Sequence, residues 1–287
     1  MPTALMCTLR PTAVACVQAS LGRAAHAAIL EHIAAADPLL TNRLHSEHGI
    51  KPLTVSNVLG LDGRGGHARV TPACTYGLRV TLLCDTLEAL ARTWTPDTLG
   101  TLMLGEVEWQ VERITADTAE HPWAGCESYE SLAATALRVA GAAPRRWALE
   151  FISPVTFRHE RTNHPLPLPE LVFGSLLDKW NALAPLPLPS ELRAVAAGLV
   201  VSNFELRSLA VPTKGGALQI GALGRCAYSA VQQNVAWLAG IDLLARFAFY
   251  GGVGAGTARG FGQTRLIAAE RDRPNARRLS ADVIPLA

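Results

Sequence analysis

The order of apolar patterns repeats along the chain, and this repetition constrains the fold more than any other feature. The first apolar segment, TALMCTLRPTAV, is typical of a strand, and a helical pattern follows over residues 22–36. Asp37-Pro38 predicts the N-cap and first turn of a second short helix over residues 38–46. The first half continues with strand patterns over residues 51–60 and 77–84, a helical pattern over 86–94 and a strand pattern over 102–114.

The second half restarts the same order. Strand patterns cover residues 147–159, 198–211, 217–231 and 263–269. Helical patterns cover residues 171–183, between the first two strands, and 232–250, before the last strand. Strand–helix–strand followed by strand–helix–strand is the ferredoxin-like pattern. We therefore expect an α+β fold of tandem ferredoxin-like (RRM-like) domains. Residues 117–146 show no clear period, so we place the boundary there, between domains at 1–140 and 145–287.

Composition excludes several classes of protein. With 49% hydrophobic and 17% charged residues the chain can bury a core, and a net charge of +2 gives it no overall basic field. The six cysteines form no CxxC pair, which argues against a zinc site or a disulfide framework and favours a reducing, cytoplasmic location. No apolar run is long enough to span a membrane. No His/Asp/Glu cluster has metal-ligand spacing, so we expect no metal and no cofactor.

The segment GGVGAGTARGFG, residues 251–262, is half glycine. It follows a helix and precedes a strand, the reverse of a dinucleotide-binding fingerprint, and it lacks the lysine of a P-loop. The remaining interpretation is a loop whose backbone approaches a large partner and donates N–H groups to phosphates. The alternative is a mobile loop with scattered arginines. The candidate binding residues are Gly252, Gly254, Gly256, Arg259, Gly260, Gly262 and Arg265.

Four stretches together resemble a known family. GGVGAGTARGFGQTRL, before the last strand, is similar to the glycine-rich signature of the repeat-associated (RAMP) CRISPR protein superfamily. LTNRLHSEHGIKPLTVSNVLG resembles the Leu-His helix end and Lys-Pro strand of its repeat-processing endoribonucleases, the Cas six family. WALEFISPVTFR and ALGRCAYSAV resemble two strands of that family's second domain. The resemblance runs from about residue 22 to residue 267.

The resemblance implies metal-independent cleavage of CRISPR precursor transcripts within their repeats, which makes guide crRNAs. In that reaction the ribose 2′-hydroxyl attacks the neighbouring phosphorus and leaves a 2′,3′-cyclic phosphate. The implied partner is CRISPR repeat RNA, as precursor and as mature crRNA, with subunits of a CRISPR effector complex as further candidates. Histidine suits the proton transfers, and lysine or arginine suits the charge that develops on the phosphate.

His45 and His48 are the candidate catalytic histidines, and Lys51 is the candidate cation. The two histidines are three residues apart, so both could share one face at the end of the short helix. Leu44-His45, six residues before Lys51, matches the family's pattern better, but the spacing leaves His48 open. The structural alternatives are a surface histidine near a helix C-terminus and a solvated lysine at a strand edge.

One departure from the family concerns its catalytic tyrosine. Many relatives carry a tyrosine on the first helix, whereas the first tyrosine here is Tyr76. Arg23, His26 and His32 are candidates to replace it, and spacing does not select among them.

A different functional class also stays open, a noncatalytic RNA-binding subunit of a CRISPR effector complex. A metabolic enzyme with a ferredoxin-like fold has only analogy of fold behind it.

Overall fold

The structure is a computed structural model that describes residues 1–46, 49–64, 66–138, 144–159, 162–213, 217–231 and 234–267. The elements of the first half are β1 (Thr3–Pro11), β2 (Ala15–Gln18), α1 (Gly22–Ala36), α2 (Pro38–Ser46), β3 (Leu53–Val55), β4 (Gly63–Arg64), β5 (His67–Val70), β6 (Tyr76–Leu82), α3 (Asp85–Ala91), α4 (Pro96–Leu99), β7 (Thr101–Leu104), β8 (Val107–Thr115), β9 (Gly125–Cys126) and α5 (Tyr129–Arg138).

The second half contains fewer and longer elements. They are β10 (Arg146–Val155), β11 (Phe157–His159), β12 (Thr162–His164), α6 (Pro169–Leu183), α7 (Leu192–Ala197), β13 (Leu199–Pro212), β14 (Leu218–Ala230), α8 (Val235–Gly251), the short 3₁₀ helix η3 (Thr257–Arg259) and β15 (Thr264–Ile267). None of the helices in the described ranges combines the length and the apolar character needed to cross a bilayer.

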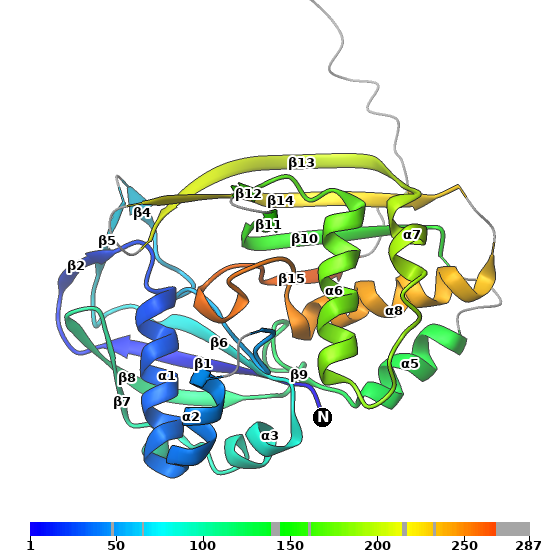
Figure 1. The fold of residues 1–287 in the computed structure, drawn as a ribbon. Helices are drawn as coiled ribbons and strands as arrows, with labels where there is room; N and C mark the ends of the chain where they lie inside the picture. Colours follow the sequence, from blue (N-terminus) through cyan, green and yellow to red (C-terminus); the bar gives the residue numbers. More distant parts are fainter. Residues whose placement is uncertain are drawn as a thin grey trace, which may run out of the picture.

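Each half contains one antiparallel sheet with the strand order of a ferredoxin-like domain. The first sheet runs β3-β6-β1-β8-β7, and the second runs β13-β14-β10-β15. In both, the first strand of the half lies between the third and fourth main strands, as the repeated pattern predicts. Figure 1 shows the two sheets one above the other, with α1 against the lower sheet and α6 against the upper one; α2 packs on α1, and α7 packs on α6. The prediction of tandem ferredoxin-like domains is confirmed.

The two cores follow the periodicities seen in the sequence. In β1, Leu5, Cys7 and Leu9 alternate toward a core that also holds Ile29 and Ile33 of α1. In β10 the alternating residues Trp147, Leu149 and Phe151 are buried, and they pack with α6 and α8. The buried side of α1 recurs every three or four residues, at Gly22, Ala25, Ala28, Ile29, Leu30 and Ile33. The short helix after it begins as predicted, since Asp37 Oδ1 accepts a hydrogen bond from the amide of Leu40 at 2.9 Å.

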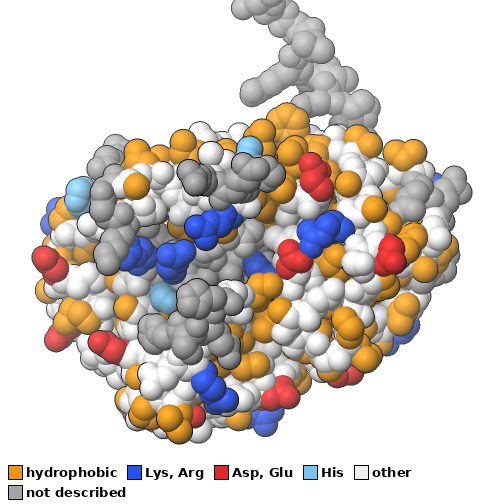
Figure 2. Space-filling view, viewed as in Figure 1, with side chains coloured by type: hydrophobic (Ala, Val, Ile, Leu, Met, Phe, Trp, Pro, Cys, Tyr) orange, Lys and Arg blue, Asp and Glu red, His pale blue; other side chains and the backbone are white. Residues whose placement is uncertain are grey.

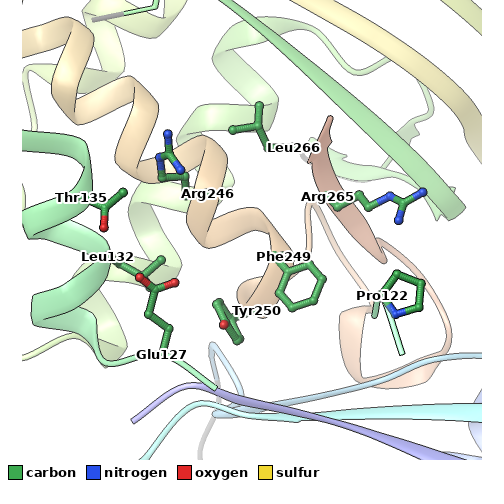
Figure 3. Close-up of a pocket in the computed structure, with 9 residues that line it drawn as sticks. All are labelled: Pro122, Glu127, Leu132, Thr135, Arg246, Phe249, Tyr250, Arg265 and Leu266. Atoms are coloured by element: carbon green, nitrogen blue, oxygen red, sulfur yellow. The ribbon is translucent and has the colours of Figure 1, made fainter. Parts of the chain in front are cut away.

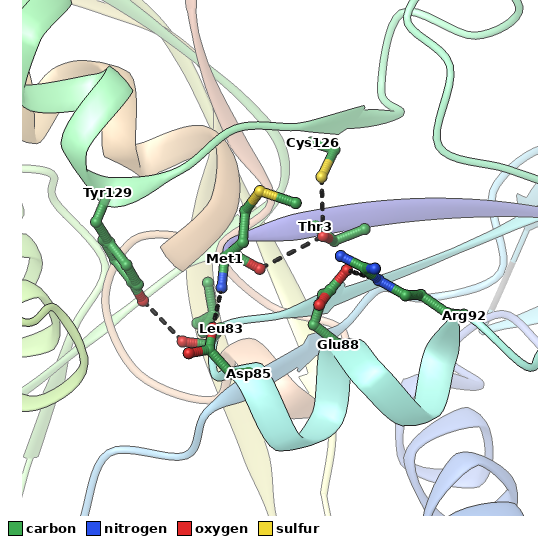
Figure 4. Close-up of polar contacts among 8 residues, drawn as sticks. All are labelled: Met1, Thr3, Leu83, Asp85, Glu88, Arg92, Cys126 and Tyr129. Atoms are coloured by element: carbon green, nitrogen blue, oxygen red, sulfur yellow. Dashed lines mark hydrogen bonds and ion pairs between the residues drawn. The ribbon is translucent and has the colours of Figure 1, made fainter.

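Residues 117–146 contain more regular structure than their composition suggests. They include β9, which pairs with β1, and the ten-residue helix α5. The buried residues of α5 are Tyr129, Leu132 and Ala136, and they recur at the three- and four-residue spacing of a helix. Figure 4 shows a hydrogen bond from this helix to the residue after β6: the hydroxyl of Tyr129 donates to the carbonyl of Leu83 at 2.8 Å. The segment is therefore a packed part of the fold.

A buried arginine of the first sheet joins the two halves. Arg79 in β6 is 0% exposed, and its guanidinium donates to the carbonyls of Trp123 (2.8 Å) and Phe249 (2.6 Å) and to Gln263 Oε1 (2.6 Å). The guanidinium carbon also lies 4.5 Å from the ring centre of Phe249 and 5.5 Å from that of Trp123. Burial lowers the pKa of Arg79 to about 9, so the group remains charged at neutral pH.

Truncation of this arginine is expected to destabilise the whole protein. Arg79→Ala leaves three buried acceptors without a donor and a cavity between two rings, so the free energy of unfolding should fall by at least about 3 kcal/mol. Denaturant unfolding followed by circular dichroism measures the change. Arg92→Ala is the matched control, because Arg92 is exposed and, within the described residues, its ion pair is with Glu88 one turn earlier. Its effect should stay within about 0.5 kcal/mol. Equal losses for the two variants would contradict this account.

Candidate functional site

The segment between α8 and β15 is a tight loop in a backbone conformation that favours glycine. Five residues have left-handed φ angles between 61° and 93°, namely Gly252, Gly254, Gly256, Gly260 and Gly262. A Cβ on Gly254 would lie 2.3 Å from the carbonyl oxygen of Thr156, and one on Gly262 would lie 2.2 Å from that of Val253. The backbone of this loop therefore approaches itself and the segment at Thr156 too closely for side chains at these glycines.

Many of the loop's N–H groups also donate within the protein. The amides of Ala255 and Gly262 donate to the carbonyls of Thr156 and Pro154, at 2.7 and 2.9 Å. Gly254 N donates to the hydroxyl of Ser175 at 3.1 Å. These bonds hold the loop in one shape, and they leave these amides unavailable to a phosphate. The sequence pattern predicts an outside partner for the backbone of this loop, whereas these three amides have acceptors within the protein.

Lys179 of α6 fixes the start of the loop. Its ammonium donates to the carbonyls of Gly251 (3.2 Å), Gly252 (2.8 Å) and Gly254 (3.1 Å), and the residue is only 8% exposed. Burial lowers the pKa of Lys179 to about 7. The three acceptors and the negative end of the α8 dipole favour the charged form, because only the ammonium has a proton for each carbonyl. We therefore treat Lys179 as a cation that organises the loop.

The far end of the loop contacts the first half. The amide of Gly260 donates to the carbonyl of Val55, the last residue of β3, at 2.9 Å. Gly22, the first residue of α1, lies so close that a Cβ there would be 2.6 Å from the Cα of Gly260. The loop, the start of α1 and the end of β3 therefore form one contiguous surface.

The two residues predicted to act in catalysis belong to the same short unit. His45 lies in the last turn of α2, and Lys51 precedes β3. The ammonium of Lys51 donates to the carbonyl of Leu44 at 2.5 Å, so it binds the end of α2 one residue before His45. This is also the contact that a lysine makes when it caps a helix. His48 lies outside the described residues.

The two predicted arginines have different surroundings. Arg259 ends η3 and is exposed, next to the bond between Gly260 and β3. Arg265 in β15 is half-buried, with its Nε 2.7 Å from Glu150 Oε2 and its guanidinium 4.8 Å from the ring centre of Trp123. Arg259 is therefore placed for an outside partner, whereas Arg265 already has partners within the protein.

Two hollows lie near these residues. The smaller, of about 300 Å³, is bordered by α5, α8 and β15, and Figure 3 shows Arg246, Phe249, Tyr250 and Arg265 around it. Arg246 Nε lies 2.7 Å from Asp242 Oδ2, so both arginines there already have carboxylate partners. The larger, of about 930 Å³, extends from the start of α1, at Arg23, to Thr213 after β13.

Positively charged side chains gather on the face of the molecule that holds the loop (Figure 2). Figure 2 shows Lys and Arg side chains, with a histidine beside them, around a hollow on this face. Arg23 and Arg259 are both exposed. Among the residues that the structure describes, no group of three His, Cys, Asp or Glu side chains could hold a metal ion. The chemistry that this surface offers is contact between cations and an anionic partner.

Sequence reasoning missed the two cations that shape the site, Arg79 and Lys179. The sequence contains a signal of burial for each: Arg79 lies within the apolar strand pattern GLRVTLL, and Lys179 lies within the apolar helical pattern LVFGSLLDKWNAL. Charged residues are rarely fully buried unless they have partners. The position of each within its strand or helix could have indicated burial, but the carbonyls that it binds are distant in the sequence.

The comparisons with known proteins show the family of this chain. The family model described as CRISPR Cas6 N-terminal domain matches residues 1–134, and the model described as CRISPR-associated endoribonuclease Cas6 matches residues 149–264. This chain belongs to the Cas6 family of CRISPR-associated endoribonucleases. A search of curated protein sequences gave no match.

Several solved structures are similar to the whole chain. Two Cas6 product complexes share 28% and 29% identity with it, at TM-scores of 0.73 and 0.74; each match covers 93% of this chain and 99% or 100% of the other. Thermus thermophilus Cas6 shares 27% identity at a TM-score of 0.69, over 93% of this chain and 98% of the other. A Cas6-related protein from Pyrococcus furiosus, at 14% identity and a TM-score of 0.64, shows the same fold.

Two glycines of the loop allow the backbone contact to be tested. Gly254 and Gly256 have similar φ angles, 75° and 77°, but the atoms nearest to a Cβ on Gly256 belong to the side chain of Phe261, at 3.3 Å. Gly256→Ala should lower the free energy of unfolding by about 1 kcal/mol, for the left-handed conformation alone. Gly254→Ala, which also presses on the Thr156 carbonyl, should cost at least about 2 kcal/mol more. Guanidinium unfolding of both variants checks this; indistinguishable midpoints would show that the contact with Thr156 is unimportant.

Proposed function

We propose that this protein cleaves CRISPR precursor transcripts within their repeats to make guide crRNAs. Its membership of the Cas6 family supports the proposal, and so do the similar solved structures, which include two Cas6 product complexes and a Cas6 substrate-mimic complex. In this proposal an N-terminal domain, residues 1–140, carries the catalytic residues. A C-terminal domain, residues 145–287, carries the glycine-rich loop.

The proposed reaction uses no metal. The 2′-hydroxyl at the cleavage position attacks the adjacent phosphorus, the bond to the 5′-oxygen of the next nucleotide breaks, and a 2′,3′-cyclic phosphate and a 5′-hydroxyl result. His45 moves a proton at one of the two oxygens, and Lys51 stabilises the charge on the phosphorane. The bond from Lys51 to the carbonyl of Leu44 carries this proposal, since it holds the lysine beside the helix turn that contains His45.

Arg259 is the proposed RNA contact of the loop. Its exposure and its place beside the Gly260–Val55 hydrogen bond put it on the surface that α1 and β3 share with the loop. The glycines contribute by holding the backbone in this shape, and Arg265 contributes through its position beside Trp123. Any contact with subunits of a CRISPR effector complex remains a prediction from the family resemblance.

The catalytic assignment predicts a loss of rate without a loss of binding. His45→Ala should slow single-turnover cleavage of repeat RNA by about 10²-fold or more, the usual scale for a general acid or base. Its affinity for uncleaved repeat RNA should stay near that of the wild type. His48→Ala is the matched control three residues away and should cleave within a few-fold of wild type. If His48→Ala is the slow variant instead, the catalytic role belongs to His48. Normal cleavage rates in both variants would show that neither histidine at this helix end is catalytic.

The proposed RNA contact predicts the opposite pattern for Arg259→Ala. Repeat RNA should bind about 1–3 kcal/mol more weakly, and the slope of log affinity against log salt should be shallower if the lost contact is to a phosphate. At saturating enzyme the bound RNA should still be cleaved at close to the normal rate. Unchanged affinity at every salt concentration would mean that Arg259 does not contact the RNA.

The chemistry itself is tested by chelation and by the product ends. Cleavage should continue in excess EDTA, because proton transfer and charge stabilisation are assigned to side chains. The upstream product should carry a 2′,3′-cyclic phosphate and the downstream product a 5′-hydroxyl, which mass spectrometry distinguishes. Strict dependence on a divalent cation, or a 5′-phosphate on the product, would exclude this mechanism. Binding of repeat RNA with no cleavage under any condition would favour the noncatalytic class.

A further inference from the structure

The side chain of Asn57 joins the end of β3 to the start of α1. Asn57 lies two residues after β3, and its Oδ1 accepts a hydrogen bond from the amide of Leu21 at 2.6 Å. Its Nδ2 donates to the carbonyl of Ala19 at 2.8 Å. Leu21 directly precedes α1, and its apolar side chain cannot cap a helix. Asn57 therefore supplies a partner to one of the amides that the start of a helix leaves unpaired.

The same end of β3 also holds the glycine-rich loop. Ser56 pairs with Gly260 in a single parallel bridge, and a Cβ on Gly260 would lie 3.4 Å from the amide nitrogen of Asn57. On its other side the loop meets α1: a Cβ on Gly22 would lie 2.6 Å from the Cα of Gly260 and 2.7 Å from the carbonyl oxygen of Arg259. Figure 1 shows η3 beside the start of α1. The backbones of the loop and the helix therefore touch with no side chain between them.

An arginine lies on each side of this backbone contact. Arg23 follows Gly22 in the first turn of α1, and Arg259 precedes Gly260 in the loop; both arginines are exposed. Arg23 also lines the larger hollow, of about 930 Å³. Guanidinium groups match the geometry of phosphate oxygens, so two of them on touching segments can bind one stretch of a nucleic-acid backbone together. Their joint contact depends on the start of α1 and the loop keeping a fixed separation.

We propose that Asn57 is a positioning residue for RNA binding. It fixes the start of α1 against the glycine-rich loop, so that Arg23 and Arg259 contact the same stretch of the repeat RNA backbone. The inference rests on the proposed function, since its ligand is the RNA that the protein is proposed to cleave. Two cations that are fixed in advance need not be ordered when the RNA binds, which favours affinity. Without the Asn57 side chain, Leu21 and Ala19 hydrogen-bond to water instead, and the first turn of α1 moves away from the loop.

The first measurement uses the RNA-free protein, so its outcome does not depend on the proposed nuclease activity. Asn57→Ala should speed amide hydrogen exchange in peptides that cover residues 19–25 by about tenfold or more, with the rest of the protein near wild type. Asn181→Ala is the matched control, because Asn181 also binds backbone outside its own helix, accepting from the amide of Leu188 (2.7 Å) and donating to its carbonyl (3.0 Å). It should leave exchange over residues 19–25 unchanged. Unchanged exchange there in Asn57→Ala would overturn the proposal.

The second measurement is the Kd for repeat RNA. Asn57→Ala and Arg23→Ala should each raise the Kd by about tenfold, whereas Asn181→Ala should leave it unchanged. Because Asn57 acts through the position of Arg23, the two effects should overlap: in the Asn57→Ala background, Arg23→Ala should raise the Kd by less than about threefold more. At saturating enzyme the cleavage rate of Asn57→Ala should stay within a few-fold of wild type, since the side chain is assigned to binding and not to the chemical step.

Gly22→Ala separates the helix from the loop in a second way. Alanine suits a helical backbone better than glycine, but its Cβ would press on backbone atoms of the loop. The Kd should therefore rise as in Asn57→Ala, and Arg23→Ala should again add little. Circular dichroism establishes that each variant is folded. A wild-type Kd in Asn57→Ala, or fully additive effects of Asn57→Ala and Arg23→Ala, would overturn this inference and leave the proposed function intact. A wild type that binds no repeat RNA would overturn both.

Discussion

The carbonyl end of α8 is the point on which the arrangement of the two halves depends. A helix leaves its last carbonyls without partners, and burying them unsatisfied is costly. Here Arg79 of the first half binds the carbonyl of Phe249, and Lys179 of the second half binds those of Gly251, Gly252 and Gly254. Both cations are buried, and each gains the acceptors that compensate for its loss of water. The same contacts join the halves, end the helix and begin the loop.

The candidate site follows from this arrangement. Once Lys179 has fixed the first glycines, the loop reaches Val55 and Gly22, and its one exposed arginine, Arg259, lies beside β3. The end of α2 is held to the start of β3 by Lys51. Residues proposed for catalysis and for RNA contact are therefore carried by neighbouring elements, although they belong to different halves of the sequence. A change in the backbone of the loop, unlike the removal of the Arg259 side chain, therefore also affects β3, which the loop contacts.

Local signals predicted much of the fold. The helix over 22–36 has a clear apolar period and appears with the predicted bounds, and Asp37-Pro38 marked the start of α2 correctly. The helix α5 was not predicted, although its buried residues Tyr129, Leu132 and Ala136 recur at helical spacing. The role of the glycines was also not predictable, because the carbonyl that excludes a side chain at Gly254 belongs to Thr156, far away in the sequence. The sequence indicates that a backbone contact occurs there, but not what is contacted.

The hydrogen bond between Arg79 and Gln263 spans 184 residues, and the contact between Gln263 and Thr54 spans 209. During synthesis the first half leaves the ribosome long before the segment that completes it. Until then Arg79 lacks two of its three acceptors, since Phe249 also comes late in the chain. The loop cannot yet contact β3. Only a chain made through β15 can assemble the site, so an interrupted chain presents the His45 segment without its support.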